Sequence, residues 1–213
     1  MKSVLISINP RWCGLIADGK KTLEIRKSRP NLKPPFKCYI YCTNGKPFLN
    51  SRNGQVYISK EDVLGNLGYG LYHRLNGKII GEFICSDIDR LGCVGSFDGA
   101  MKVIWIGIYD RSNSYWKNFD PSPSCLNDEQ VNRYLSGKDG FAWHIADMKI
   151  YDNPKDISAF YKCGTLSESD FEYSIYDGSG DPARNSYASY LFTRKVRRPP
   201  QSWCYVEEME DKP

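Results

Sequence analysis

Histidine is scarce in this sequence of 213 residues, in which only His73 and His144 are present. Imidazole is the commonest side-chain ligand of transition metals, so a histidine-based metal site has few candidates here. Cysteine occurs at eight positions, but no two cysteines have the Cys-x-x-Cys spacing of a zinc site. Several cysteines lie in apolar strand patterns, where a reduced thiol behaves as a small hydrophobic group. We therefore expect neither a metal nor a cofactor.

Long apolar runs are also lacking. No stretch approaches the ~20 apolar residues that a membrane-spanning helix needs, and residues 1–8 are too short for a secretory signal. With 41% hydrophobic and 25% charged residues, the composition is that of an ordinary globular protein. We expect a cytoplasmic protein that forms a single domain over residues 1–213, with an oligomeric state that the sequence does not define.

The net charge is only +4, but the basic residues are clustered. Seven of them lie between Lys20 and Lys37, against the single acid Glu24, and a second cluster occupies residues 194–198. Clustered positive charge attracts phosphate groups, because binding releases condensed counterions. For an isolated basic run a solvated charged face is the favoured interpretation, and a phosphate-bearing partner is the alternative.

The turn around Gly19 carries most of the information. Asn9 and Pro10 are typical of a helix start, and Gly19 of a helix end, so residues 10–18 are predicted to form a short helix. From Thr22 the pattern changes to alternation, which predicts a strand with Leu23 and Ile25 on the core side. Glu24 and Arg26 then project together from the opposite face, whereas alternation does not fix the direction of Lys21.

The rest of the chain predicts an α+β fold built around a small mixed β-barrel. A second helix is expected to begin at Asn127 and end at Gly137, and a third, short one to begin at Asn153–Pro154. Long loop insertions are expected near residues 44–77, 111–140 and 163–190, which are rich in Gly, Ser, Asn and Pro. Strands are predicted at 3–8, 23–27, 38–43, 79–88, 102–109, 142–151 and 203–207.

The order Ser-Ile-x-Pro, helix, Gly-x-Lys-Thr-x-Glu-x-Arg resembles the opening of the ASCH domain, a relative of the PUA-like RNA-binding barrels. Its residues here are Ser7, Ile8, Pro10, Gly19, Lys21, Thr22, Glu24 and Arg26. Three later stretches, at 81–85, at 142–145 followed by 154–160, and at 198–203, are also similar to ASCH proteins of bacterial and phage type. The resemblance implies a binding module that recognises RNA or a nucleotide-like ligand in a cleft lined by the Lys21/Glu24/Arg26 segment. The ligand-binding residues implied are Ser7 at the floor, Lys20, Lys21, Thr22, Glu24, Arg26 and Trp143.

Two alternatives to a binding module remain. The family includes N4-acetylcytidine amidohydrolases, whose catalytic lysine Lys21 matches, and members linked to ribonuclease activity. In such a hydrolase Lys21 and Glu24 would be catalytic, although Glu24 stands where the amidohydrolase has a threonine, and a carboxylate cannot replace a hydroxyl nucleophile. The second alternative is a protein-interaction domain that uses the tyrosine-rich segment 163–190.

Structural roles are the competing interpretation for each candidate. Glu24 and Arg26 would then form an ion pair that holds the barrel closed. Trp143 and Trp203 would pack in the core rather than stack on a base, and His144, alone on its strand, would be structural.

Overall fold

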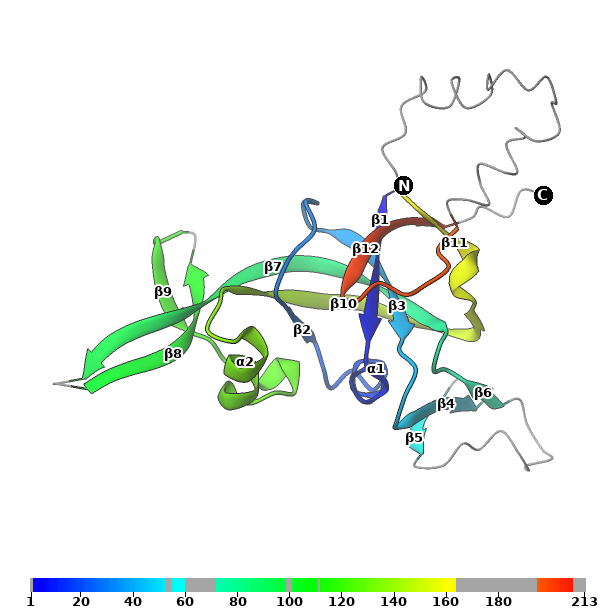
Figure 1. Ribbon diagram of the computed structural model, residues 1–213, viewed down its shortest axis with the longest axis horizontal. Helices are drawn as coiled ribbons and strands as arrows, with labels where there is room; N and C mark the ends of the chain where they lie inside the picture. Colours follow the sequence, from blue (N-terminus) through cyan, green and yellow to red (C-terminus); the bar gives the residue numbers. More distant parts are fainter. Residues whose placement is uncertain are drawn as a thin grey trace, which may run out of the picture.

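The protein is described from a computed structural model, which defines residues 2–52, 55–59, 72–98, 101–110, 112–163 and 195–208. Within these ranges strands dominate, with two α-helices and two short 3-10 helices (Figure 1). The elements are β1 (Ser3–Ile8), α1 (Pro10–Ala17), β2 (Leu23–Arg26), β3 (Phe36–Cys42), β4 (Phe48–Arg52), β5 (Gln55–Ser59), β6 (Tyr72–Arg74), β7 (Ile79–Asp98), β8 (Met101–Asp110), β9 (Tyr115–Asn118), η2 (Ser122–Ser124), α2 (Asp128–Leu135), β10 (Gly140–Lys155), η3 (Ile157–Ala159), β11 (Phe160–Lys162) and β12 (Trp203–Glu208). The predicted α+β class is confirmed.

The main sheet has nine strands in the order β11-β12-β1-β3-β7-β10-β2, with β8 beside β7 and β9 beside β8. β1 and β3 pair in parallel, and the other pairs of this sheet are antiparallel. The second half of the 20-residue strand β7 pairs with β8 in a long hairpin, which extends to the left in Figure 1. A separate three-stranded sheet, β5-β4-β6, contacts α1.

The predicted closed barrel is wrong for the described residues, because their strands form an open sheet that ends at β11 and β2. Both edges of β1 are occupied, by β12 and β3. The free edge of β2 faces the η2 segment, where the Thr22 N–H donates a hydrogen bond of 2.8 Å to Pro123 O. A non-strand segment therefore covers the edge at which a barrel would close.

Two of the three predicted helices are confirmed. α1 spans Pro10–Ala17, and α2 has Asn127 as its N-cap within a reciprocal capping box with Gln130. The helix predicted from Asn153–Pro154 is wrong, because β10 runs through these residues to Lys155. The residue before a proline favours extended backbone, and the next N-cap is Asp156, which begins η3.

Two of the three predicted loop insertions contain regular secondary structure. Residues 44–77 contain the small sheet β4–β6, and residues 111–140 contain β9, η2 and α2. Apart from Cys163, the segment 163–190 lies outside the described residues, and with it the tyrosine-rich surface. No helix among the described residues is long and apolar enough to cross a membrane.

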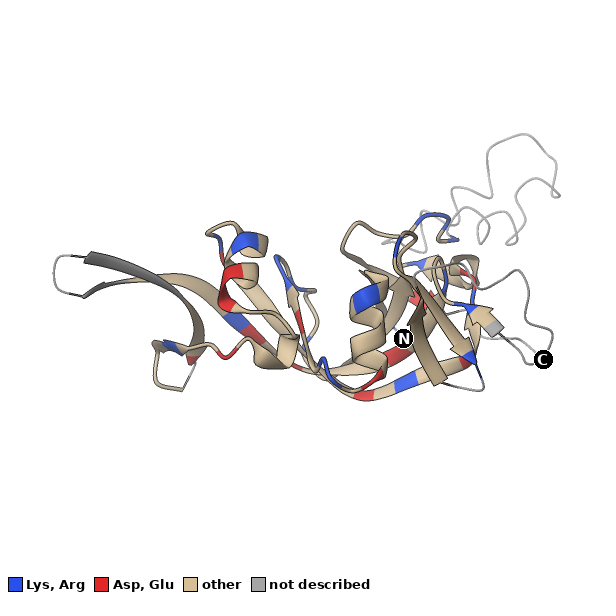
Figure 2. Cartoon of the chain, turned by 90° about the horizontal axis from the view of Figure 1, so that it is seen from below, with Lys and Arg blue, Asp and Glu red and all other residues tan. Residues whose placement is uncertain are grey.

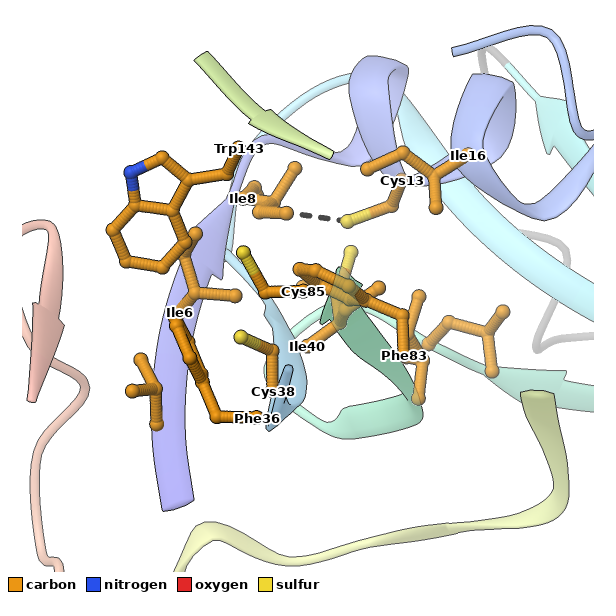
Figure 3. Close-up of a cluster of buried hydrophobic side chains, with 14 of the residues drawn as sticks. Ile6, Ile8, Cys13, Ile16, Phe36, Cys38, Ile40, Phe83, Cys85 and Trp143 are labelled. Atoms are coloured by element: carbon orange, nitrogen blue, oxygen red, sulfur yellow. Dashed lines mark hydrogen bonds between the residues drawn. The ribbon is translucent and has the colours of Figure 1, made fainter. Parts of the chain in front are cut away.

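The largest core cluster lies between α1 and the main sheet (Figure 3). Four cysteines are buried in it as thiols, namely Cys13, Cys38, Cys42 and Cys85, and all eight cysteines of the chain are free. Burial raises the pKa of the Cys85 thiol to about 12, so this thiol is inert rather than nucleophilic. Within the described ranges no group of three or more His, Cys, Asp or Glu side chains is arranged to hold a metal ion.

Candidate functional site

A pocket of about 490 Å³ opens between α1, β2 and α2. Its volume lies within the ~300–1,000 Å³ of ordinary small-molecule sites. Five of the eight residues of the sequence motif line it. The complete lining consists of Ser7, Ile8, Asn9, Trp12, Lys21, Glu24, Ile25, Arg26, Leu126, Gln130, Arg133 and Tyr134.

Local sequence explains how the motif reaches the pocket. The Asn9 side chain accepts a hydrogen bond of 3.0 Å from the Arg11 N–H and caps α1, with Pro10 at the first helical position. At the other end Gly19 has φ of +69°, a left-handed conformation that glycine adopts without strain. The chain therefore reverses after one short helix and starts β2 at Leu23, two residues after Lys21.

Lys21, Glu24 and Arg26 form a buried ion-pair network, with residue exposures of 3%, 7% and 7%. Glu24 lies between the two cations, with its Oε2 3.2 Å from Lys21 Nζ and its Oε1 3.1 Å from an Arg26 terminal nitrogen. Two positive charges around one carboxylate leave the network with a net charge of about +1. Such pairs are rare inside proteins because each ion loses its hydration.

Lys21 is held by the backbone as well as by Glu24. Its ammonium group donates hydrogen bonds of 2.8 Å to the carbonyl oxygens of Leu23 and Ser124. The contact with Glu24 Oε2 is ionic, and this oxygen accepts no hydrogen bond from the described residues. Lys21 thus joins β2 to η2, and three oxygens surround its nitrogen.

Arg26 connects β2 to the opposite part of the sheet. One terminal nitrogen donates a hydrogen bond of 2.7 Å to Ser7 O on β1, and the other lies 3.4 Å from Ser202 Oγ. Its Nε is buried and has no hydrogen-bond partner among the described residues. Ser7 lies at the pocket as predicted, but its hydroxyl is turned away and donates to Pro200 O at 2.7 Å.

Two aromatic side chains flank this charged network. Trp12 projects from α1, and its ring centre is 5.4 Å from Lys21 Nζ. Tyr134 projects from α2 and remains 38% exposed. Burial raises the pKa of the Tyr134 hydroxyl, while Arg26 lowers it by its charge and a hydrogen bond and Glu24 raises it by its charge. The Tyr134 hydroxyl is therefore electrostatically part of the network.

The other predicted ligand-binding residues lie away from the pocket. Lys20 is exposed and pairs with Asp18 at 3.0 Å, and the Thr22 side chain is exposed. Trp143 is fully buried, with ring centres of Phe36 and Trp203 both 6.1 Å away, as the core-packing alternative describes (Figure 3). His144 pairs with Asp89 at 2.6 Å on the other side of the strand.

The sequence interpretation missed Trp12, Gln130 and Tyr134 as pocket residues. Trp12 fits the apolar face of α1 equally well, so its spacing alone indicates a core position. Gln130 and Tyr134 lie more than a hundred residues after the motif, and no local pattern places α2 beside β2. A tyrosine among charged residues on a capped helix is the only signal the sequence offers.

The fold and the site define the class: an α+β domain with an open mixed sheet and a buried-charge pocket beside its edge strand β2. No protein-family model matches the sequence, and no curated protein matches it. The structure is similar to a crystal structure of an ASCH protein from Zymomonas mobilis, with 14% identity, a TM-score of 0.45, and coverage of 98% of this chain and 88% of that one. A tyrosine-to-phenylalanine variant of that protein matches with the same identity and TM-score, over 99% of this chain and 92% of the variant.

Proposed function

We propose that this chain is an ASCH-type binding domain that recognises RNA or a nucleotide-like ligand in the pocket beside β2. One observation carries the proposal. Arg26 Nε is buried without a hydrogen bond from the described residues, and Glu24 Oε2 accepts none either, although it is paired with Lys21 at 3.2 Å; both belong to side chains that line the pocket. An unsatisfied buried polar group costs about 1–3 kcal/mol. A rotation that turns these atoms towards the pocket would let a ligand that offers an acceptor and a donor recover part of this cost.

A nucleobase has the required shape and chemistry. Its edge presents acceptors and donors side by side, and its flat faces suit the aromatic rings of Trp12 and Tyr134, which line the same pocket. Base stacking on an aromatic side chain contributes about 1–3 kcal/mol per base. The excess positive charge of the Lys21/Glu24/Arg26 network suits a carbonyl-rich base edge or an attached phosphate.

The hydrolase alternative requires Lys21 and Glu24 to give up contacts that they make in the structure. To act as base or nucleophile, Lys21 would have to leave Leu23 O, Ser124 O and Glu24 Oε2. Glu24 occupies the position of the amidohydrolase threonine and is engaged by two cations. We therefore expect no turnover of N4-acetylcytidine or of labelled RNA, and turnover abolished by Lys21→Ala would establish an enzyme instead.

Fluorescence polarisation with a labelled single-stranded RNA at low salt tests the binding function. Because Trp12 and Tyr134 form the walls, Trp12→Ala and Tyr134→Ala are expected to weaken binding roughly 5- to 150-fold, the equivalent of one lost stacking contact. Tyr115→Ala is the matched control, since Tyr115 is also an exposed tyrosine, on β9, outside the pocket lining. Unchanged affinity in both folded wall variants would refute the proposal.

A further inference from the structure

The segment 195–202, called here the C-terminal strap, links the pocket to a second, strongly basic hollow. This hollow has a volume of about 300 Å³. Within the described part of the chain its lining consists of four cations, Lys162, Lys195, Arg197 and Arg198. It shares none of these residues with the pocket beside β2.

The strap is anchored where it passes the hollow. Val196 is fully buried in the cluster that contains Phe160, and its N–H donates a hydrogen bond of 2.8 Å to Phe160 O. Lys195 forms an isolated bridge with Tyr161 on β11. A buried residue between Lys195 and Arg197 holds the neighbouring cations at the surface, so the backbone beneath the hollow is fixed before any ligand arrives.

The charge at the hollow is local. Figure 2 shows Lys and Arg as well as Asp and Glu in both halves of the molecule, so neither half carries one sign alone. A phosphate placed in the hollow is attracted by the cations that line it. Two of the four are arginines, whose planar guanidinium groups match the oxygens of a phosphate.

The other end of the strap touches the pocket. Pro200 O accepts the hydrogen bond from the Ser7 hydroxyl at 2.7 Å, and Ser202 O accepts from the Ser7 N–H at 2.9 Å. Ser202 Oγ lies 3.4 Å from the Arg26 guanidinium. Three residues separate Arg198 from Ser202, so the two Cα atoms lie at most about 14 Å apart along an extended chain. The hollow and the pocket are therefore within reach of one short oligonucleotide.

We propose that the hollow binds backbone phosphates of the same single-stranded RNA whose base occupies the pocket, with the strand following the C-terminal strap. This inference rests on the proposed function. It assigns the hollow to a strand rather than to a free phosphate, because the strap joins it continuously to the residues around Arg26. Sequence preference then comes from the pocket, and the hollow adds affinity that depends on salt but not on sequence.

The experiment compares an octanucleotide RNA with a nucleoside monophosphate, each titrated into the full chain at several salt concentrations. The test variant is Lys195→Ala/Arg198→Ala, and Lys46→Ala/Lys138→Ala, which removes two exposed charges elsewhere, is the matched control. We expect the test variant to bind the octanucleotide about tenfold more weakly. The slope of log K against log salt should shrink by about 1.4, since each phosphate contact on a single strand contributes about 0.7. Monophosphate affinity should not change, and the control should behave like the wild type.

The outcomes separate this proposal from the proposed function. If the octanucleotide affinity and salt slope of the test variant equal those of the control while Trp12→Ala still weakens binding, phosphate binding by the hollow is refuted and ligand binding in the pocket is retained. If the test variant weakens the monophosphate as much as the octanucleotide, the hollow takes the phosphate of a small ligand, and the strand proposal is wrong. If the test variant alone weakens the octanucleotide and Trp12→Ala does not, the hollow is supported as a phosphate site and the pocket function fails.

Discussion

Buried charge is the dominant feature at the scale of single residues. Lys21, Glu24 and Arg26 have almost no exposed surface, yet they lie at the rim of a pocket rather than deep in the apolar core. The network stabilises the fold, because Lys21 joins β2 to η2 and Arg26 joins β2 to β1. The structural and the ligand-binding interpretations of these residues are therefore compatible, because the side chains that hold the edge of the sheet also line the pocket.

Replacing Arg26 by alanine should destabilise the fold strongly. The change leaves Glu24 Oε1 and Ser7 O without their partner at a buried position, and breaking a buried pair costs about 3–5 kcal/mol. Arg26→Lys should lower the free energy of unfolding by less, because lysine keeps the positive charge and loses only the planar guanidinium group with its several N–H donors. Urea denaturation measures the free energy of unfolding. Lys20→Ala, which removes an exposed lysine of the same turn, is the control and should cost under about 1 kcal/mol. Equal losses in the two alanine variants would contradict a buried network.

The pair between His144 and Asp89 should make stability depend on pH. The hydrogen bond between His144 and Asp89 raises the pKa of His144 above 6.5, the ordinary value for histidine, and the charge of Asp87 adds to the shift. Because the folded pKa is the higher one, this stabilisation is complete below the unfolded pKa and is lost as the pH rises through the folded pKa. The effect is under about 1 kcal/mol, since both side chains are partly exposed to solvent.

Urea midpoints measured between pH 5.5 and pH 8.5 test this dependence. The difference between wild type and His144→Asn should be largest at the acid end and should shrink towards pH 8.5. Asp89→Asn should remove most of the same dependence, because it removes the group that raises the pKa. A difference that grows with pH would contradict the assignment.

At the scale of elements, the helix-turn-strand unit was predictable and its partner was not. Asn9, Pro10 and Gly19 are local signals, so α1 and the start of β2 follow from sequence. The cap of α2 was equally readable from Asn127 and Gln130. That α2 forms the second wall of the pocket depends on its packing against β8 through residues such as Val131 and Leu135, which no local pattern encodes. The small sheet β4–β6 escaped prediction because its strands are three to five residues long and rich in polar side chains.

Removing the cap of α2 should affect the pocket as well as the fold. In Asn127→Ala the Gln130 N–H loses its side-chain acceptor at the start of the helix, at a cost of about 1 kcal/mol. α2 carries Gln130 and Tyr134, so RNA affinity should fall by more than the unfolded fraction explains. Asn127→Ser keeps a capping group and is the control. Wild-type affinity in a destabilised Asn127→Ala protein would show that α2 is not part of the binding site.

At the scale of the whole molecule, topology departs from the simplest prediction. Many short strands favour a barrel, but here β1 is paired on both edges and η2 covers the free edge of β2. Three-residue η2 carries no strong sequence signal, so the opening of the sheet at this point could not be inferred from alternation. The pocket lies beside that open edge. Because no strand of the described residues pairs with β2 there, a charged side chain, Lys21, connects β2 to η2 in place of a ladder of backbone hydrogen bonds.

The most direct measurement of the central claim is calorimetric titration of the four nucleoside monophosphates into the wild-type protein and into Trp12→Ala. If a base occupies the pocket beside β2, at least one monophosphate binds the wild type, and its affinity falls about tenfold or more when the indole wall is removed. Binding of no monophosphate at millimolar concentration, or equal affinity for the wild type and the folded variant, would contradict it.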